Sequence, residues 1–146
     1  MELVEAYTVA AARTGALIGA TRADQLESST PCRTWTAREL INHIVGGQYV
    51  FAGAAAGAPL PDLSAGAPDF AAGDAVAAQR DAIGAASAAF ADPGLGERMA
   101  ELPFGTLPAG MVPVVSRVNN CHAITVSRGV SSTIHRDFSL RWWIHV

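Results

Sequence analysis

One stretch, residues 29–51, constrains this chain more than any other, because it combines a fixed loop with a strongly marked helix start. Pro31 locks its own φ and biases the residue before it towards extended geometry. Thr36 and Glu39 have the spacing of a capping box: the threonine hydroxyl can accept a hydrogen bond from the Glu39 amide, and the Glu39 carboxylate can accept one from the Thr36 amide. These signals predict a helix over residues 37–56.

The apolar side of this helix carries a histidine. Residues that follow the i, i+3, i+4, i+7 spacing form one stripe: Leu40, His43, Ile44, Gly47 and Phe51. His43 is therefore expected to point towards the core side, where Gly46 and Gly47 allow close approach of a backbone or a ligand. Trp35 and Leu40 have the spacing of a hydrophobic staple, and no ligand role is assigned to Trp35.

Two interpretations of His43 follow from this placement. A histidine on an apolar stripe is more often a hydrogen-bonded core residue than a ligand. Imidazole is nevertheless the commonest protein ligand for zinc-type metals, so a metal site is the more specific hypothesis of the two. The residues alone leave both interpretations open.

Composition favours one mostly helical, cytoplasmic domain of 146 residues. The net charge is −3 and the ten basic residues are all arginines, so no basic patch indicates nucleic-acid binding. No apolar run reaches the ~18 residues of a membrane span, and the acidic N-terminus is unlike a signal peptide. Two cysteines, Cys32 and Cys121, make no disulfide framework.

The remaining segments complete a helical pattern. A first helix is predicted over residues 2–20. Residues 57–73 are rich in Gly, Pro and Asp, and a connection of this length indicates a crossover or a loop over a site. Asp74 caps a third helix that runs to about residue 90. Its residues Val76, Ile83 and Phe90 recur every seventh position, which predicts packing along one narrow seam.

Beyond the third helix the pattern is less regular. Residues 99–102 indicate a short extended piece, and residues 107–110 open a fourth helix. Pro113 then has to lie in its first turn, or the helix starts later. After Gly110 the composition changes abruptly, since the only later alanine is Ala123. We therefore divide the chain into a helical-bundle core, residues 1–110, and residues 111–146, which are the last helix plus a divergent tail. The tail is a second small element, a segment that folds on a partner, or the product of a reading-frame change.

Several segments carry a resemblance to a known family. The runs Thr30-Pro-Cys-Arg-Thr-Trp-Thr36, Arg38-Glu-Leu-Ile-Asn-His43 and Val45-Gly-Gly resemble the opening motif of the metal-binding domain of the mycothiol-dependent maleylpyruvate isomerase family, within the DinB-like superfamily. Leu102-Pro-Phe-Gly-Thr-Leu-Pro108 resembles the family segment that leads into the last core helix. The resemblance covers about residues 1–110. It implies an all-α, up-down four-helix bundle with a long crossover.

The resemblance also implies a divalent metal, often zinc, held in the bundle interior. Family members supply one histidine from the second helix, and an acid or histidine plus a second histidine from the last helix. His43 matches the first of these ligands, and His122 is the match for the histidine of the last helix. Ligands one turn apart on one helix suit the geometry, because such side chains project towards a common point.

The last helix departs from the family pattern. Val118 stands four residues before the matching histidine and cannot bind a metal, and Ile124 and Thr125 stand where a Trp-Asp pair is expected. Asn119 and Cys121 are interpreted as lying at the wrong helical angle to substitute. The sequence therefore does not contain all three ligands that the family pattern requires.

Three hypotheses of function remain. The first is a divalent-metal-binding bundle related to mycothiol-dependent isomerases or transferases, which uses a small thiol or an electrophilic substrate, with zinc and mycothiol as the implied cofactors and a homodimer as an allowed assembly. The second is a non-catalytic, truncated or diverged bundle with an incomplete metal site. The third is an interaction protein whose tail, with Trp142 and Trp143, contacts a partner. No nucleic-acid or membrane partner is expected.

Overall fold

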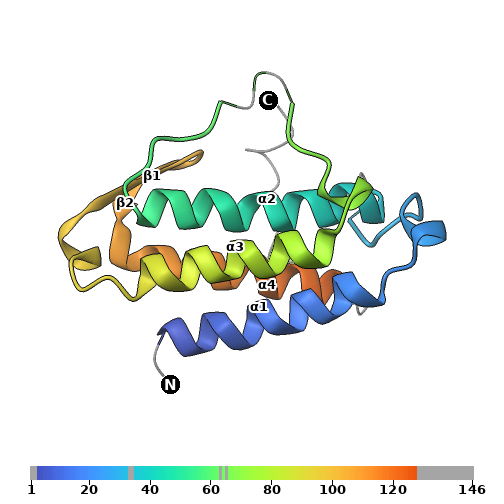
Figure 1. Cartoon of the computed structure of the whole chain (residues 1–146), viewed down its shortest axis with the longest axis horizontal. Helices are drawn as coiled ribbons and strands as arrows, with labels where there is room; N and C mark the ends of the chain where they lie inside the picture. Colours follow the sequence, from blue (N-terminus) through green and yellow to red (C-terminus); the bar gives the residue numbers. More distant parts are fainter. Residues whose placement is uncertain (1–2, 33–34, 63, 65, 128–146) are drawn as a thin grey trace.

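A computed structural model of the chain describes residues 3–32, 35–62, 64 and 66–127, with side chains of the last helix as far as residue 120. Within these residues four long helices form a bundle (Figure 1): α1 (Leu3–Ala20), α2 (Ala37–Ala55), α3 (Ala75–Phe90) and α4 (Val112–Ser127). Short elements lie between them: η1 (Ala23–Gln25), η2 (Phe70–Ala72), η3 (Leu95–Glu97), β1 (Met99–Leu102), β2 (Gly105–Pro108) and η4 (Ala109–Met111).

The connection between α2 and α3 determines the topology. Figure 1 shows α2 running in the opposite direction to α1, after which residues 57–73 cross over the bundle so that α3 runs parallel to α2 and beside it. The chain then turns through the hairpin, and α4 runs parallel to α1. The predicted four-helix bundle with a long crossover is confirmed in this coarse form.

The prediction of an all-α fold is wrong in one respect, because a small antiparallel hairpin precedes α4. Its strands pair from Met99 opposite Pro108 to Leu102 opposite Gly105. Gly105 has a φ of +134°, which a residue with a side chain rarely adopts, so it closes this turn. Residues 107–108 therefore belong to β2, and the fourth helix begins at Val112, which agrees with the alternative of a later start.

The hydrogen bonds that cap the starts of α2 and α3 form as the sequence predicts. Thr36 Oγ1 accepts a hydrogen bond from the Glu39 amide at 3.3 Å, and Glu39 Oε2 accepts one from the Thr36 amide at 2.7 Å. Asp74 Oδ1 accepts a hydrogen bond from the Ala77 amide at 2.9 Å. Both predicted N-caps are thus confirmed, and each satisfies backbone donors that a helix start leaves without an intrahelical partner.

The bundle core has apolar ends and a polar middle. At the hairpin end the rings of Tyr7 and Phe90 meet edge to face, with centroids 5.0 Å apart. At the other end Ile18, Leu40 and Ile44 form a second apolar cluster. Fully buried polar side chains from all four helices occupy the interior as well: Thr14, Gln48, Gln79, Ser116 and Asn120.

The predicted seam of α3 is only partly correct. Phe90 is buried, but Val76 is 44% exposed. The residues of α3 that are buried instead form a stripe rotated around the helix: Gln79, Ala82, Ala86 and Phe90. Val76 and Gln79 both lie against α1, because a Cβ added at Gly19 would be 3.6 Å from Val76 and one added at Gly15 would be 3.9 Å from Gln79.

Buried hydrogen bonds fix α4 in the bundle. Ser116 Oγ donates to Gln48 Oε1 at 3.0 Å, and Thr14 Oγ1 donates to the Asn120 carbonyl at 3.2 Å. Residues 112–127 are helical although their composition is a poor helix former, because tertiary contacts outweigh weak intrinsic propensity. Residues 128–146, on which much of the predicted tail divergence or frame change falls, lie outside the described residues. Among the described helices, none combines the length and apolarity of a membrane span.

Candidate ligand and metal site

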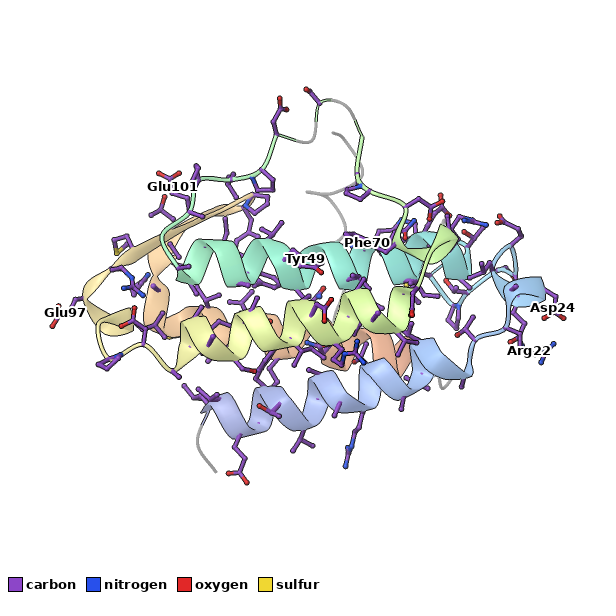
Figure 2. The ribbon with its side chains drawn as sticks, in the orientation of Figure 1. Arg22, Asp24, Tyr49, Phe70, Glu97 and Glu101 are labelled. Carbon is purple, nitrogen blue, oxygen red and sulfur yellow. The ribbon has the colours of Figure 1, made fainter. Side chains whose placement is uncertain are left out.

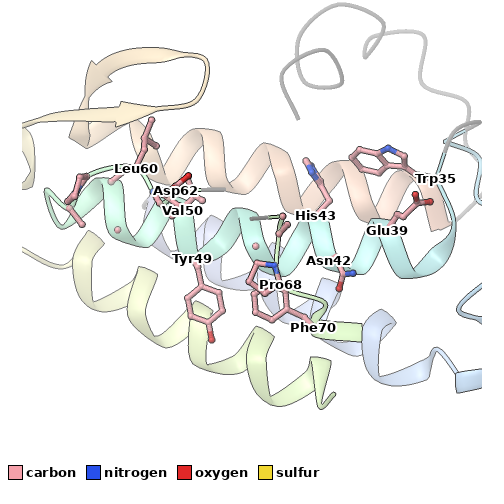
Figure 3. A pocket seen from close by; sticks show the side chains of 18 residues that line it. Trp35, Glu39, Asn42, His43, Tyr49, Val50, Leu60, Asp62, Pro68 and Phe70 are labelled. Atoms are coloured by element: carbon pink, nitrogen blue, oxygen red, sulfur yellow. The ribbon is translucent and has the colours of Figure 1, made fainter. Parts of the chain in front are cut away.

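A cavity of about 830 Å³ lies along one face of α2 and is covered by the connection of residues 57–73 (Figure 3). Gly46, Val50 and Gly53 of α2 line it from below, and residues 58–62 and 66–68 of the connection line it from above. The connection is therefore both a crossover and a loop over a site, as its length indicates.

His43 lines this cavity and is half-buried. Its ring contacts Trp35, with centroids 4.5 Å apart and planes inclined at 52°. In Figure 3 both side chains project to the same side of α2. The rest of the predicted stripe is buried (Leu40, Ile44, Gly47 and Phe51). The expectation for His43 itself must be corrected, because it stands at the edge of the stripe and faces the cavity.

Two further aromatic rings form part of the cavity wall. Tyr49 and Phe70 stack with centroids 5.7 Å apart and planes inclined at 20°, and Figure 2 shows them close together over α2. Tyr49 Oη donates a hydrogen bond to the Ala78 carbonyl of α3 at 3.2 Å. A Cβ added at Gly46 would lie 3.7 Å from Phe70 Cε2, an ordinary contact distance, so Phe70 packs over this part of α2.

One end of the connection is fastened to α2 by polar contacts. Asp69 accepts hydrogen bonds from Arg38 Nη1 and Asn42 Nδ2, each at 2.9 Å. Asn42 Oδ1 in turn accepts one from the Ala71 amide at 2.9 Å. The hydrogen bond from Asn42, helped by the charge of Arg38, lowers the pKa of Asp69. These contacts set the position of Phe70 against the cavity.

The side chains of α4 reach α2 one turn away from His43. A Cβ added at Gly47 would lie 3.1 Å from Asn119 Nδ2, which places the Asn119 amide against α2, whereas Val118 is 46% exposed. Asn119 therefore faces α2 one helical turn from His43. Asn119 Nδ2 is buried, and no hydrogen-bond partner for it is found in the described part of the chain.

His122 is part of the backbone of α4, but its side chain lies outside the described residues. The register of the helices still gives its level in the bundle. Ser116 bonds Gln48, Asn119 faces Gly47, and α4 runs antiparallel to α2. Continuing by one turn brings the backbone near residue 122 to about the level of His43, because both helices rise 1.5 Å per residue.

The described residues do not by themselves make a complete metal site. They contain no group of three or more His, Cys, Asp or Glu side chains that could hold a metal ion. Within them, the side chains with ligand atoms that line the cavity are the His43 imidazole, the Asn42 amide and the carboxylates of Glu39 and Asp62. Glu39 Oε2 and Asp62 Oδ1 already accept backbone hydrogen bonds from Thr36 and Ser64, and the Asn119 amide lies one turn away. A divalent metal therefore fits this site only with a further ligand from beyond residue 120.

Fold and site together define a DinB-like helical domain: four helices, a long crossover, and a histidine of α2 at a cavity. The sequence profile of the mycothiol maleylpyruvate isomerase N-terminal domain matches residues 7–114, and the chain belongs to that family. The prediction from the sequence motifs is thus confirmed.

Two relatives share a shorter stretch. Both are described as uncharacterized proteins of Mycobacterium tuberculosis, one from strain CDC 1551 / Oshkosh and one from strain ATCC 25618 / H37Rv. Each is 56% identical to this chain over 32 residues, which span 22% of this chain and 18% of the relative. No solved structure matches the chain.

Sequence reasoning found His43 and the glycines but missed the aromatic wall of the cavity. Trp35 was interpreted only as a staple, and it does pack with the apolar cluster that contains Leu40. Its second contact, with His43, depends on how the loop before α2 folds. No pattern in the sequence predicts that Tyr49 and Phe70 stack, because the two rings meet only when the connection crosses the bundle.

Proposed function

We propose that this protein binds a divalent metal ion, zinc in the first place, with His43 as a ligand. We further propose that it works with a small thiol, mycothiol in the first place, on an electrophilic small molecule. Family membership supports both parts of the proposal. His122 is the second ligand in this proposal, because the helix register brings its backbone to the level of His43.

The position of His43 is the observation that carries the proposal. A capped helix and the Trp35 ring hold the imidazole at the wall of a cavity. The residue is half-buried, so the ring is shielded from bulk water on one side and accessible from the cavity on the other. A ligand histidine needs this combination of a fixed ring and an open approach.

A bound divalent ion would supply Lewis acidity that lowers the pKa of a thiol or a water molecule. The residues of this chain do the positioning. Trp35 limits rotation of the His43 ring, the aromatic pair of Tyr49 and Phe70 binds the apolar part of a small molecule, and the connection above α2 limits access of water. Asn119 brings an amide towards the same region, although amides are weaker ligands for zinc than imidazole or thiolate.

The metal content of purified protein tests this proposal. The wild type, His43→Ala and His122→Ala are equilibrated with zinc, dialysed, and analysed by inductively coupled plasma mass spectrometry. We expect both variants to bind zinc at least about tenfold more weakly than the wild type, a difference of about 1.4 kcal/mol. His145→Ala is the control for loss of any histidine and is expected to keep the wild-type content. Equal metal content in the wild type and His43→Ala would contradict the proposal.

A non-catalytic bundle is the second candidate function, and one observation favours it. In the described residues the interior near His43 is occupied by carboxamides and hydroxyls rather than by a third ligand side chain. Thermal unfolding with and without a chelator separates the two candidates. A metal that binds only the folded state must raise the melting temperature, so an unchanged melt on chelation supports the non-catalytic bundle.

A further inference from the structure

The cavity above α2 is long and narrow. The residues of α2 that line it run from Glu39 to Ala54, and fifteen steps of about 1.5 Å give a length of about 22 Å. A volume of about 830 Å³ spread over this length corresponds to a mean cross-section of about 40 Å². In Figure 3 His43 lies towards one end of the cavity and Leu60 towards the other. A ligand that fills the cavity must therefore be elongated rather than compact.

The end of the cavity near Leu60 has small and mostly apolar walls. Val50 and Ala54 line it on the helix and are buried, and residues 58–61, which are Ala, Pro, Leu and Pro, line it on the connection. Asp62 also lies here, but its side chain is exposed and its carboxylate accepts a backbone hydrogen bond from within the connection at 2.9 Å. Hydrocarbon suits such walls, because it gains contact there and leaves water without needing a polar partner.

The turn after α2 closes this end of the cavity. The Ala58 amide donates a hydrogen bond to the Gly53 carbonyl at 2.8 Å, and Gly57 has a φ of +78°, which lets the chain reverse directly after the helix. A Cβ added at Gly53 would lie 3.7 Å from Ala58 Cβ, so the connection contacts the helix here. Gly53 stands ten positions after His43, or about 15 Å further along the axis. The closed end therefore limits the length of a molecule whose other end lies at His43.

We propose that the cavity binds a molecule with a single hydrocarbon tail, whose polar head lies at His43 and whose tail runs along α2 to Gly53. The stacked rings of Tyr49 and Phe70 lie between the two ends and give the tail an apolar surface. A carboxylate and a thiolate are both suitable heads, since both bind zinc. The place of the head at His43 rests on the proposed function, whereas binding of the tail does not require a metal.

Straight-chain carboxylates of increasing length test the tail site: butanoate, hexanoate, octanoate and decanoate, each below its micelle concentration. An extended ten-carbon chain is about 12 Å long, since each bond of about 1.5 Å advances it by about 1.3 Å, so it fits the cavity. Dissociation constants are measured by calorimetry or ligand-observed NMR titration on full-length protein, once with zinc and once with a chelator. We expect a gain of about two- to fourfold for each added methylene group, so decanoate should bind at least about fiftyfold more tightly than butanoate. Equal binding of the two would overturn the inference.

Two leucine variants locate the tail. Gly53→Leu fills the closed end of the cavity and should weaken decanoate binding at least about tenfold, while butanoate binding stays within about twofold of the wild type. Gly84→Leu is the matched control, because Gly84 is exposed on α3 and an added Cβ meets nothing within 4 Å, so it should keep both affinities. Circular dichroism shows that both variants are folded. Unchanged decanoate binding in Gly53→Leu, or an equal loss in Gly84→Leu, would contradict the proposed location.

Leu60→Gln repeats the test from the connection without filling the cavity. Leu60 is 39% exposed, so its replacement should leave the fold intact. It should weaken decanoate binding by about threefold or more and leave butanoate binding unchanged, because only the longer tail reaches this wall. Equal effects on the two probes would count against the inference.

His43→Ala separates the tail site from the metal proposal. Where this variant loses zinc, all four carboxylates should bind more weakly by a similar factor, and the ratio of decanoate to butanoate affinity should stay as in the wild type. Where it keeps its zinc, the metal proposal fails and the same ratio still decides the tail site. A ratio that falls to about one in His43→Ala or in the presence of the chelator would overturn the inference.

Discussion

Gln48 is the centre of the buried polar interior, and its replacement gives the most informative stability prediction. Its Oε1 accepts hydrogen bonds from Tyr7 Oη at 2.9 Å and from Ser116 Oγ at 3.0 Å, so one side chain joins three helices. The change Gln48→Met keeps the length of the side chain but removes the acceptor. Burial raises the pKa of the Tyr7 hydroxyl, so this group stays neutral and needs an acceptor at every working pH.

The expected cost follows from counting the groups left without a partner. Two buried hydroxyl donors lose their acceptor, at about 1–3 kcal/mol each. The Ser116 hydroxyl can turn to a carbonyl of its own helix, which lowers its share. The substitution also removes Gln48 Nε2, a buried donor for which the described structure shows no hydrogen-bond partner. Removing this donor stabilises the folded protein by about 1–3 kcal/mol. We therefore expect Gln48→Met to lower the free energy of unfolding by about 1–3 kcal/mol.

A double-mutant cycle with Tyr7→Phe isolates the hydrogen bond. In the wild type Tyr7→Phe should cost about 1 kcal/mol, because the ring keeps its packing on Phe90 and loses only its hydroxyl. In the Gln48→Met background the same change removes a stranded hydroxyl, so it should cost nothing or stabilise the protein. The coupling energy between the two positions should therefore be about 1–2 kcal/mol.

The free energies of unfolding are obtained from urea titrations at 25 °C that are monitored by circular dichroism at 222 nm. The melting temperature should fall by about 2–4 °C for each kcal/mol of stability that is lost. Gln79→Met is the matched control: Gln79 is just as buried, but neither of its polar atoms finds a partner within the described residues. Its replacement should be neutral or stabilising. The reasoning is refuted if Tyr7→Phe costs the same in both backgrounds, or if Gln79→Met costs as much as Gln48→Met.

Two further predictions concern the elements that position the cavity. Thr36→Ala removes the N-cap of α2 and should lower the free energy of unfolding by about 1 kcal/mol. Glu39→Gln should leave the free energy of unfolding nearly unchanged, because glutamine also supports a capping box. Equal losses for the two variants in urea unfolding would contradict the capping argument. The pKa of Asp69 is lowered in the folded state, so its stabilising contribution is present above its unfolded pKa and is lost as pH falls through the lower folded pKa. The melting temperature of Asp69→Asn should therefore fall less than that of the wild type on acidification below about pH 4, and parallel acid profiles would count against this.

Local chemistry explains why the helix starts could be predicted. The capping box at Thr36 and the aspartate cap at Asp74 depend on contacts within three residues, so the sequence contains everything they require. The phase of α2 also identified His43 and Gly46 as candidate site residues, although not the element that covers their side of the helix. Family membership also followed from local motifs.

Tertiary packing explains where the predictions were wrong. The seventh-residue repeat through Val76 predicts a contact stripe, but the packing of α3 in the bundle buries the face that carries Gln79, Ala82 and Ala86. His43 was assigned to the core side because helical phase gives a direction without saying which element lies there. The connection of residues 57–73 arrives above it and turns that side into a cavity wall.

By itself the sequence determined the starts of α2 and α3, the long crossover and the family, because these depend on short-range hydrogen bonds, on turn residues and on a recognisable motif. Only the tertiary structure decided that Asn119 rather than Val118 faces α2, and that Trp35, Tyr49 and Phe70 line one cavity. These features join residues that are far apart in the chain. Their positions are set by how the helices and the connection pack against one another, which no local pattern records.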